Sequence, residues 1–377
     1  MPGVSLVRHE GEAEMVRHFL AVAAAVGLAV TAAASAAAAS AGAATATSPS
    51  WHLVYQARTA RVTSLYGITA PSRKDAWAVG FTTAKSGRYS PNYVHWNGKR
   101  WQAVTIAVAR GFRPWVAEST SPSDVWFFGA LGSNFEALHL SHGRWQLLPA
   151  TGDISSTTIA VLGAGNVWMI GTAGGCDDST GQCSTQLLHW TGKQWVSYTV
   201  DALIQALAGS GTHVWAAGIT GPDVTTNSTG QTVLYQFTDG SWRSVSSPHP
   251  ATGVPPMLAA EPHGQLWLLA APLHGDRWVL RHWTGNRWTR VSVPRRLVKA
   301  TSVALPLTYD GGGGVWVGSY LHWTGSRWID AFGGADLFPA LSGFSLQAIA
   351  PVPGSGSLWA AGADNKGRMI AVYGSQP

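Results

Sequence analysis

Residues 75–80 read DAWAVG, and residues 95–101 read HWNGKRW. The first string is a short apolar stretch that opens on a polar side chain and closes on a glycine, which is typical of a buried β-strand. In the second string a strand is followed by a tight turn carrying glycine, and a tryptophan then opens the next strand. Together the two strings predict neighbouring antiparallel strands.

Both strings recur along the chain, and the number of copies follows from the tryptophan that each copy of the first string contains. Its first and last examples, Trp77 and Trp359, lie 282 residues apart, which is six steps with a mean of 47. A fixed period of this length, built from short strands, indicates the blades of a β-propeller. The seven tryptophans are Trp77, Trp126, Trp168, Trp215, Trp267, Trp316 and Trp359.

The two ends of the chain indicate how the ring closes. The last unit ends with the string AVYG at 371–374 and has no fourth strand with a tryptophan, whereas the string WHLVY at 51–55 has no unit of its own. Joining these segments completes a blade and leaves no sheet edge unpaired. The sequence therefore predicts an all-β fold, a seven-bladed β-propeller with four strands per blade, closed by the N-terminal strand joining the last blade.

The composition agrees with this fold class. Of 377 residues, 46% are hydrophobic and only 12% are charged, while 44 are glycine and 20 are tryptophan. So few charged residues disfavour a helical bundle or coiled coil, and so many tryptophans exclude a disordered chain. We expect residues 47–377 to form a single propeller domain.

Residues 1–46 have the features of a signal peptide followed by an alanine-rich leader. Arg17 precedes the apolar run FLAVAAAVGLAV at 19–30, and small residues follow at 41–43. That order predicts a secreted, extracellular protein. The alternative is an uncleaved membrane anchor, because the apolar and alanine-rich run is long enough to span a bilayer. The start codon, Met1 or Met15, is left open.

The two cysteines, Cys176 and Cys183, are expected to form a disulfide, as pairs in exported proteins normally do. Two thiols without a nearby histidine make a poor zinc site, so no metal is predicted. Asp177 and Asp178 are weak candidates for calcium ligands, and a solvated loop is the alternative. No cofactor is expected, because the phosphate-binding glycine loop and the usual catalytic motifs are missing from the sequence.

The charge pattern bears on partners. Without residues 1–46 the chain has 23 basic and 16 acidic residues, a net charge of +7. The basic residues are scattered along the sequence, which disfavours nucleic-acid binding. Attraction to an anionic cell-wall polymer stays open.

The repeat also carries a family resemblance. A strand ending in glycine, an aromatic strand, a glycine turn and a tryptophan resemble the kelch repeat. The pattern D-x-W-A-V-G … H-W-x-G-x-x-W is similar to the repeats of secreted actinobacterial propeller proteins. This resemblance covers residues 51–377 and implies the propeller fold without implying an activity. The signatures of WD40 blades and of the sialidase Asp-box are missing.

Residues that recur in the blades are interpreted as framework, and residues that differ are candidates for function. The histidine of the second string recurs in separate blades, so we expect it to be hydrogen-bonded framework. Connections between the second and third strands vary in length and share one face with the blade-to-blade connections. This loop-rich face is the expected binding surface. The recurring histidines are His95, His139, His189, His282 and His322.

On the loop-rich face, aromatic residues with polar neighbours suit sugar rings, which need both a stacking plane and hydrogen-bonding groups. The alternative is that these rings pack loops onto the scaffold. The candidate ligand-binding residues are Arg88, Tyr89, Trp115, Phe135, Glu136, Asp276 and Trp278.

Glu118 is a weak catalytic candidate. It falls in the innermost strand of its blade, where other blades have apolar or small residues, so we expect it to face the central channel. It could act as an acid or base if paired with a second carboxylate. The predicted function is a non-catalytic binding module for an extracellular glycan, cell-wall polymer or protein. The alternatives are a carbohydrate-active hydrolase or lyase, and a structural interaction protein of the cell envelope.

Overall fold

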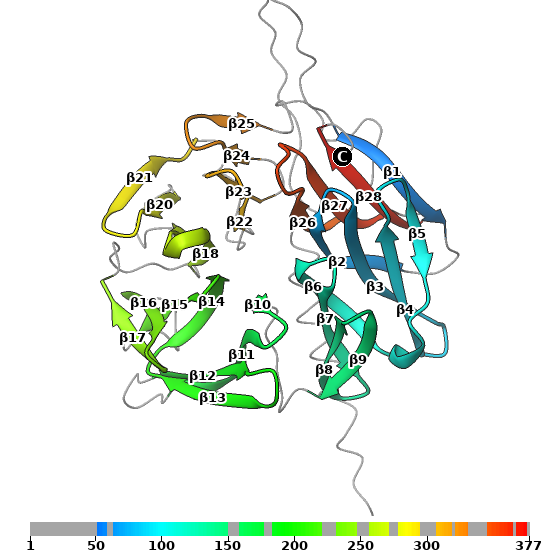
Figure 1. Ribbon diagram of the computed structural model, residues 1–377, viewed down its shortest axis with the longest axis horizontal. Coiled ribbons are helices and arrows are strands. Elements are labelled where there is room, and N and C mark those ends of the chain that lie inside the picture. The colour runs from blue at the N-terminus through cyan, green and yellow to red at the C-terminus, as the bar shows by residue number, and fades with distance from the viewer. Residues whose placement is uncertain are drawn as a thin grey trace, which may run out of the picture.

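The computed structural model describes residues 51–58, 63–149, 158–176, 183–220, 231–246, 256–270, 278–294, 307–318, 321–330, 345–364 and 367–374. The expected leader, residues 1–46, lies outside these segments and stays a prediction. Within them the chain forms seven four-stranded antiparallel sheets, which confirms the predicted fold class. Figure 1 shows the sheets as the blades of a ring, with β2, β6, β10, β14, β18, β22 and β26 nearest its centre.

The first four blades follow one another along the chain, and in each blade the strands run in sequence order from the innermost to the outermost. Blade one contains β2 (Thr63–Ser72), β3 (Asp75–Thr83), β4 (Tyr89–Trp96) and β5 (Trp101–Val104). Blade two contains β6 (Arg113–Ser121), β7 (Asp124–Leu131), β8 (Asn134–Ser141) and β9 (Arg144–Pro149). Blade three contains β10 (Ile159–Gly163), β11 (Asn166–Cys176), β12 (Cys183–Trp190) and β13 (Trp195–Val200). Blade four contains β14 (Leu203–Ser210), β15 (His213–Thr220), β16 (Gln231–Thr238) and β17 (Ser241–Val245).

The remaining blades keep the same order, and two short 3₁₀ helices lie in connections, η1 (Ala107–Ala109) and η2 (Pro262–Gly264). Blade five contains β18 (Met257–Ala260), β19 (Leu266–Ala270), β20 (Val279–Trp283) and β21 (Trp288–Ser292). Blade six contains β22 (Leu307–Tyr309), β23 (Val315–Val317), β24 (Leu321–Trp323) and β25 (Trp328–Asp330). Blade seven contains β26 (Ser345–Pro351), β27 (Leu358–Asp364), β28 (Gly367–Tyr373) and β1 (Trp51–Arg58).

Blade seven joins the two ends of the chain. Strand β1 pairs antiparallel with β28, and Trp51 lies opposite Tyr373. The sheet order is β1-β28-β27-β26, so the N-terminal strand is the outermost strand of the last blade. The predicted closure is therefore confirmed. Because the outer edge of β28 is covered by β1, it is not available for pairing with another chain.

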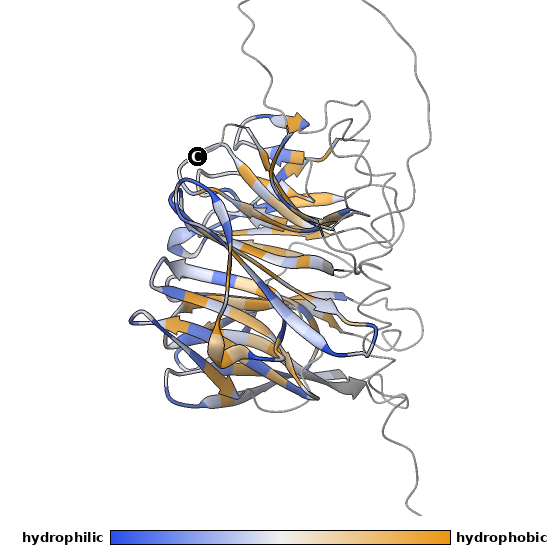
Figure 2. Ribbon diagram, turned by 90° about the vertical axis from the view of Figure 1, so that its right-hand side faces the viewer, coloured by the Kyte–Doolittle hydropathy of each residue, from blue (hydrophilic) through white to orange (hydrophobic). Residues whose placement is uncertain are grey.

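The core lies between neighbouring blades. All seven tryptophans of the first string are buried, as the repeat predicts. Trp359 of blade seven, for example, packs with Leu65 and Val94 of blade one. Figure 2 shows hydrophobic residues along the strands and hydrophilic residues at many turns. Among the described residues, no helix has the length and apolar character needed to cross a membrane.

The glycine that closes the string DAWAVG is required by a β-bulge. In blade one the register of β2 shifts between Leu65 and Gly67, next to the pair formed by Leu65 and Gly80. A Cβ atom at Gly80 would collide with the backbone oxygen of Ser64, so only glycine fits there. The same bulge and obstruction recur in blades two, four and seven, at Gly129, Gly218 and Gly362.

Candidate functional site

The two faces of the ring carry different connections. In blades one to six, the hairpin turns between the first and second strands and between the third and fourth lie on one face, here called the uniform-turn face, and blade seven adds the turn between its first two strands. Four of the outer turns close with the same backbone hydrogen bond, from Asn97, Thr191, Thr284 or Thr324 to the carbonyl three residues later. The loop-rich face carries the other connections, which differ in length from the short connection 132–133 to the long connection 331–344.

The recurring histidines belong to the framework near the uniform-turn face. In blade two the ring of His139 stacks on Trp126 with centroids 3.6 Å apart, and the two residues lie opposite each other in the ladder. His139 Nε2 lies 2.8 Å from Asp124 Oδ1, and Trp126 Nε1 donates to the same oxygen at 2.9 Å. The carboxylate therefore fixes both rings. Hydrogen-bonded framework histidines were the prediction, and this geometry confirms it.

Blade three uses an amide for the same purpose. Asn166 Oδ1 accepts a hydrogen bond from Trp168 Nε1 at 2.9 Å and lies 3.0 Å from His189 Nε2. Burial lowers the pKa of His189. Because an amide is neutral and His189 resists protonation, these side chains carry no charge in blade three. In blade two the corresponding acceptor is the carboxylate of Asp124, which is charged.

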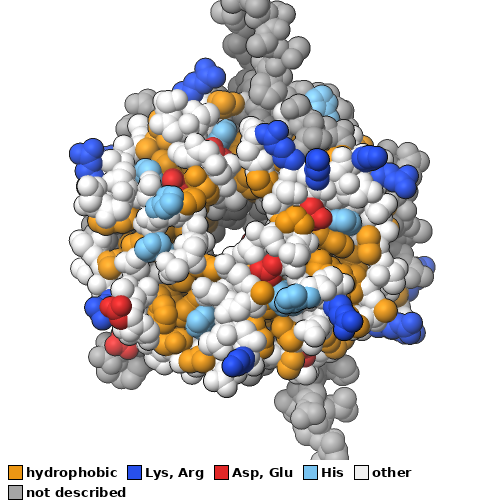
Figure 3. All heavy atoms as spheres, viewed as in Figure 1, with side chains coloured by type: hydrophobic (Ala, Val, Ile, Leu, Met, Phe, Trp, Pro, Cys, Tyr) orange, Lys and Arg blue, Asp and Glu red, His pale blue; other side chains and the backbone are white. Residues whose placement is uncertain are grey.

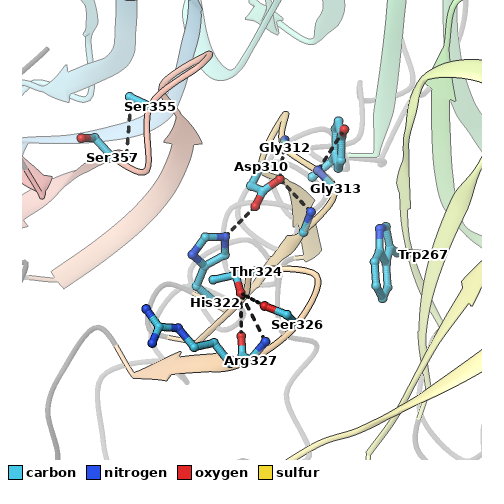
Figure 4. Close-up of polar contacts among 12 residues, drawn as sticks. Trp267, Asp310, Gly312, Gly313, His322, Thr324, Ser326, Arg327, Ser355 and Ser357 are labelled. Carbon is cyan, nitrogen blue, oxygen red and sulfur yellow. Dashed lines mark hydrogen bonds and ion pairs between the residues drawn. The ribbon is translucent and has the colours of Figure 1, made fainter.

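Blades five and six lack an aspartate at the position of Asp124, and an acidic residue from the preceding turn replaces it. Glu261 lies 3.1 Å from His282 Nε2 and also accepts a hydrogen bond from Trp267 Nε1. In blade six His322 points at Asp310, with Nε2 2.7 Å from Oδ2 (Figure 4). Figure 3 shows histidine side chains beside acidic ones at several places around the ring. These acidic residues are therefore structural.

A cluster of aromatic and basic side chains lies on the loop-rich face, between blades one and two. It consists of Tyr66, Phe81, Tyr89 and Arg113, and is called the Tyr89–Arg113 cluster below. The guanidinium carbon of Arg113 lies 4.4 Å from the centre of the Tyr89 ring. The edge of Tyr89 meets Phe81 with centroids 5.6 Å apart, and Phe81 stacks on Tyr66 at 4.9 Å.

The cluster is held by contacts from both blades. Tyr89 is the first residue of β4 and Arg113 the first residue of β6, so both are at strand ends on the loop-rich face. Arg113 also donates a hydrogen bond from Nη2 to the carbonyl of Gly132 at 2.5 Å. Both Tyr89 and Arg113 are partly exposed, and Arg88 beside them is exposed. A guanidinium has five N–H donors, so this arrangement can present further donors to a ligand.

Other predicted binding residues have a packing role. Phe135 is 5% exposed and packs between blades two and three, with Trp115 edge-on at 5.8 Å. These contacts of Phe135 agree with the alternative interpretation, in which the ring packs a loop onto the scaffold. Glu136 is also buried, and its burial raises the pKa of its carboxyl group. Trp115 is partly exposed.

The prediction that Trp278 contacts a ligand needs correction. Its side chain is 6% exposed and packs with Trp267, Leu269 and Leu280 in the core between blades five and six. Trp278 directly precedes β20, so its ring enters the apolar core instead of the loop surface. Its neighbour Asp276 lies outside the described residues.

The cysteines occupy facing positions. Cys176 ends β11 and Cys183 begins β12, and the two are paired in the ladder. Facing residues of an antiparallel pair have Cα atoms about 4.5–5.5 Å apart, a separation that a disulfide spans. The bond itself stays a prediction. Asp177 and Asp178, the weak calcium candidates, lie outside the described residues.

Glu118 lies on β6, the innermost strand of blade two, opposite Trp126. The equivalent positions of the other blades, each facing its own tryptophan, hold only alanine or threonine, as the sequence indicated. Burial raises the pKa of Glu118 from its ordinary value of 4.5 to about 7. Those equivalent residues are Thr69, Ala160, Ala208, Ala259, Thr308 and Ala350.

Glu136, the other glutamate of blade two, is not placed to work with Glu118. Glu118 lies opposite Trp126 of β7. Glu136 lies opposite Gly129, which is three positions after Trp126 in the same strand. Side chains alternate between the two faces of a sheet, so these carboxyl groups point to opposite faces. Within the described residues Glu118 has no side-chain hydrogen-bond or ion-pair partner either. Glu118 and Glu136 therefore do not form a catalytic pair with each other.

Some residues of the site were missed in the sequence. The sequence did not indicate the contact of Arg113 with Tyr89, which belongs to the neighbouring blade. Glu261 and Asp310 were missed as histidine partners, because they fall outside the repeated string. The only signal of this role in the sequence is that each acidic residue lies six positions before the tryptophan of its blade, Glu261 before Trp267 and Asp310 before Trp316.

Comparison with known proteins supports the fold. No family model and no curated protein matches the chain. A solved structure titled YCF48 bound to D1 peptide is 17% identical with a TM-score of 0.52, and the match covers 86% of this chain and 97% of that one. A streptogramin B lyase is 14% identical with a TM-score of 0.54, covering 87% and 98%. The β-propeller domain of the Trilobed protease from Pyrococcus furiosus is 9% identical with a TM-score of 0.55, covering 84% and 94%.

At these identities the likeness shows the propeller fold and nothing about a ligand. The matches lend no support to the kelch-like and actinobacterial parts of the resemblance, which rest on the repeat pattern alone. They also leave the predicted export untested.

Proposed function

We propose that this protein is a secreted, non-catalytic propeller that binds a carbohydrate or a protein through its loop-rich face. The observation that carries the proposal is the Tyr89–Arg113 cluster. It places an aromatic ring and a guanidinium from two different blades side by side, partly exposed, at the end of rigid strands. Rings and hydrogen-bond donors fixed in this way are typical of recognition sites for sugars and for peptides.

The position of Glu136 relative to Glu118 favours binding over catalysis by this pair. Glu118 and Glu136 point to opposite faces of their blade, so the pair needed for acid–base hydrolysis is not formed by them. The fold is compatible with binding of a peptide, because the propeller YCF48, whose structure has a TM-score of 0.52 to this chain, was solved bound to the D1 peptide.

A glycan array and a peptide library, each probed with the full chain, test the proposal. We expect a ligand whose binding falls about tenfold or more in Tyr89→Ala, since the ring holds Arg113 in position. Lys99→Ala and Asn286→Ala, both in exposed turns of the uniform-turn face, are the matched controls and should bind normally. Loss of binding in the controls and not in Tyr89→Ala would place the site on the opposite face.

A carbohydrate-active enzyme is the second candidate, and one observation favours it. A carboxyl group whose pKa is about 7 holds its proton near neutral pH, as a general acid must. Turnover in a panel of glycoside hydrolase and lyase substrates, abolished by Glu118→Gln, would favour this function over binding alone.

A further inference from the structure

Four basic residues lie in or directly after the two connections of the loop-rich face where blades one and two meet. Lys85 and Arg88 lie in the connection between β3 and β4, Arg110 lies between β5 and β6, and Arg113 begins β6. The contact of Arg113 with Tyr89, the residue after Arg88, brings the two connections together. We call Lys85, Arg88, Arg110 and Arg113 the basic patch. We propose that the basic patch binds an anionic polysaccharide, an inference that rests on the proposed function and specifies its ligand.

Acidic residues do not neutralise the patch in the described part of the chain. None of its four members forms an ion pair there, and the segments 84–89 and 105–115 contain no aspartate or glutamate. Glu136, the acidic residue near the same end of blade two, is 8% exposed, so it faces the interior. Like charges left together in this way repel one another, and a polyanion would relieve that repulsion.

The backbone under the patch is ordered before any ligand arrives. The connection 84–88 is closed by hydrogen bonds from Ala84 N to Arg88 O at 2.8 Å and from Gly87 N to Ala84 O at 2.9 Å. The connection 105–112 is anchored in the core by Ile106, Ala109 and Phe112, all buried. A surface fixed in advance loses little conformational entropy on binding, which favours affinity.

The surface also offers an apolar contact of the kind that sugar rings use. Val108 in η1 is 53% exposed, one of two exposed large hydrophobic residues among the described ones. It lies two residues before Arg110 in the sequence. A polysaccharide with a charge on each unit presents both anions and C–H faces, which fits this mixture of guanidinium and apolar groups. Guanidinium groups bind carboxylate and phosphate oxygens through two parallel hydrogen bonds.

The arrangement favours a polysaccharide over a nucleic acid. Proteins that bind single strands without sequence preference stack bases on open aromatic faces. Here one face of Tyr89 is covered by Arg113, and Phe81 meets the ring edge-on. The rings therefore position the guanidinium and do not form a base-stacking platform.

The test measures binding of the full chain to polygalacturonate, a polysaccharide that carries carboxylates, and to a phosphomannan, a polysaccharide that carries phosphodiesters. Methyl-esterified polygalacturonate is the uncharged control, and single-stranded DNA is the competing polyanion. The variant Arg88→Gln/Arg110→Gln removes two exposed charges from the patch. The variant Lys99→Gln/Lys193→Gln removes two exposed charges from the uniform-turn face and is the matched control.

We expect binding to at least one of the two charged polymers that weakens about tenfold in the patch variant, changes less than about twofold in the control, and weakens as salt increases. The polymer that binds more strongly identifies whether the patch prefers a carboxylate or a phosphodiester. Equal weakening in both variants would overturn the proposal, since net charge alone would then explain binding. DNA binding as strong as polysaccharide binding would overturn it as well.

The proposed function and this inference fail in different ways. Binding of an uncharged glycan or a peptide that depends on Tyr89 but not on Arg88 and Arg110 would keep the proposed function and overturn the polyanion inference. Absence of binding to every probe would overturn both. Circular dichroism and thermal unfolding confirm that each variant is folded, and all four substituted residues are exposed, so folding is expected to be unaffected.

Discussion

Nε2 of His322 lies 2.7 Å from Oδ2 of Asp310, although the position that holds aspartate in blades one and two is Gly314 in blade six. The other oxygen of Asp310 accepts hydrogen bonds from the amides of Gly312 and Gly314 at 2.7 and 2.9 Å. One carboxylate thus orients the histidine that stacks on Trp316 and also folds the turn beside it.

Asp310→Ala should therefore be markedly destabilising. It leaves His322 and two turn amides without their acceptor, which typically costs about 1–3 kcal/mol for a buried partner. Urea unfolding of the variant and the wild type measures this. Asp239→Asn, which removes an exposed ion pair with Arg243 and keeps a residue type that tolerates the positive φ of 52° at this position, should change stability by less than about 0.5 kcal/mol. Equal stability of the two variants would contradict a structural role for Asp310.

Low pH should destabilise the folded protein through its framework carboxylates, of which Asp124 is the example. Burial opposes the ionisation of Asp124, but hydrogen bonds from His139, Thr120 and Trp126 outweigh it and lower the pKa. A lowered pKa in the folded state means that stability is complete above the unfolded value of about 4 and is lost as pH falls through the folded value. Asp124→Asn should flatten this part of the curve of Tm against pH. An unchanged slope below about pH 4 would contradict the prediction.

Glu118 should have the opposite pH dependence. Its pKa is raised from 4.5 to about 7 by burial, so its contribution is complete below the unfolded value and is lost as pH rises through about 7. Glutamine stays uncharged, so Glu118→Gln should raise Tm relative to wild type at about pH 8 and change it little at about pH 4. The same difference in Tm at both values would show that burial of the charge is not the cause.

Trp51→Ala should destabilise the closing blade. Trp51 packs against the pair Trp316 and Leu358 and faces Tyr373 across the ladder. It is partly buried, so we expect about 3 kcal/mol, the lower end of the range for tryptophan truncation. His52→Ala, at an exposed position of the same strand, is the control. Deleting residues 51–55 should cost more, because it uncovers the edge of β28; near-normal stability of that deletion would argue against closure.

Trp278→Ala should reduce stability and not affinity for a ligand. The side chain fills the core between blades five and six, so its loss leaves a cavity and costs about 3–5 kcal/mol. Thermal and urea unfolding measure the effect. A variant with wild-type stability and weakened ligand binding would restore the original interpretation of this residue as a contact.

The fold was predictable because each blade repeats the same physical requirements. The string DAWAVG combines a buried tryptophan with a glycine that the β-bulge demands, and both requirements are local, so they recur at a fixed period. The contact between Tyr89 and Arg113 was not predictable. It joins two blades, and it depends on the path of the connection 105–112, which no repeated string determines. Trp278 was misplaced because the length of a connection does not show where the following strand begins.

The pairing of Trp51 with Tyr373 joins residues 322 positions apart in the sequence. During synthesis, blades one to six can form from neighbouring segments, but the first strand has to wait for the last one to emerge. Contacts of such long range slow folding, because a large loop must close before they form. Ring closure should accordingly be the final and slowest folding step, and until then β1 and β28 present open edges to other chains. A chaperone that holds the first strand during this interval would protect the protein when it is most prone to aggregate.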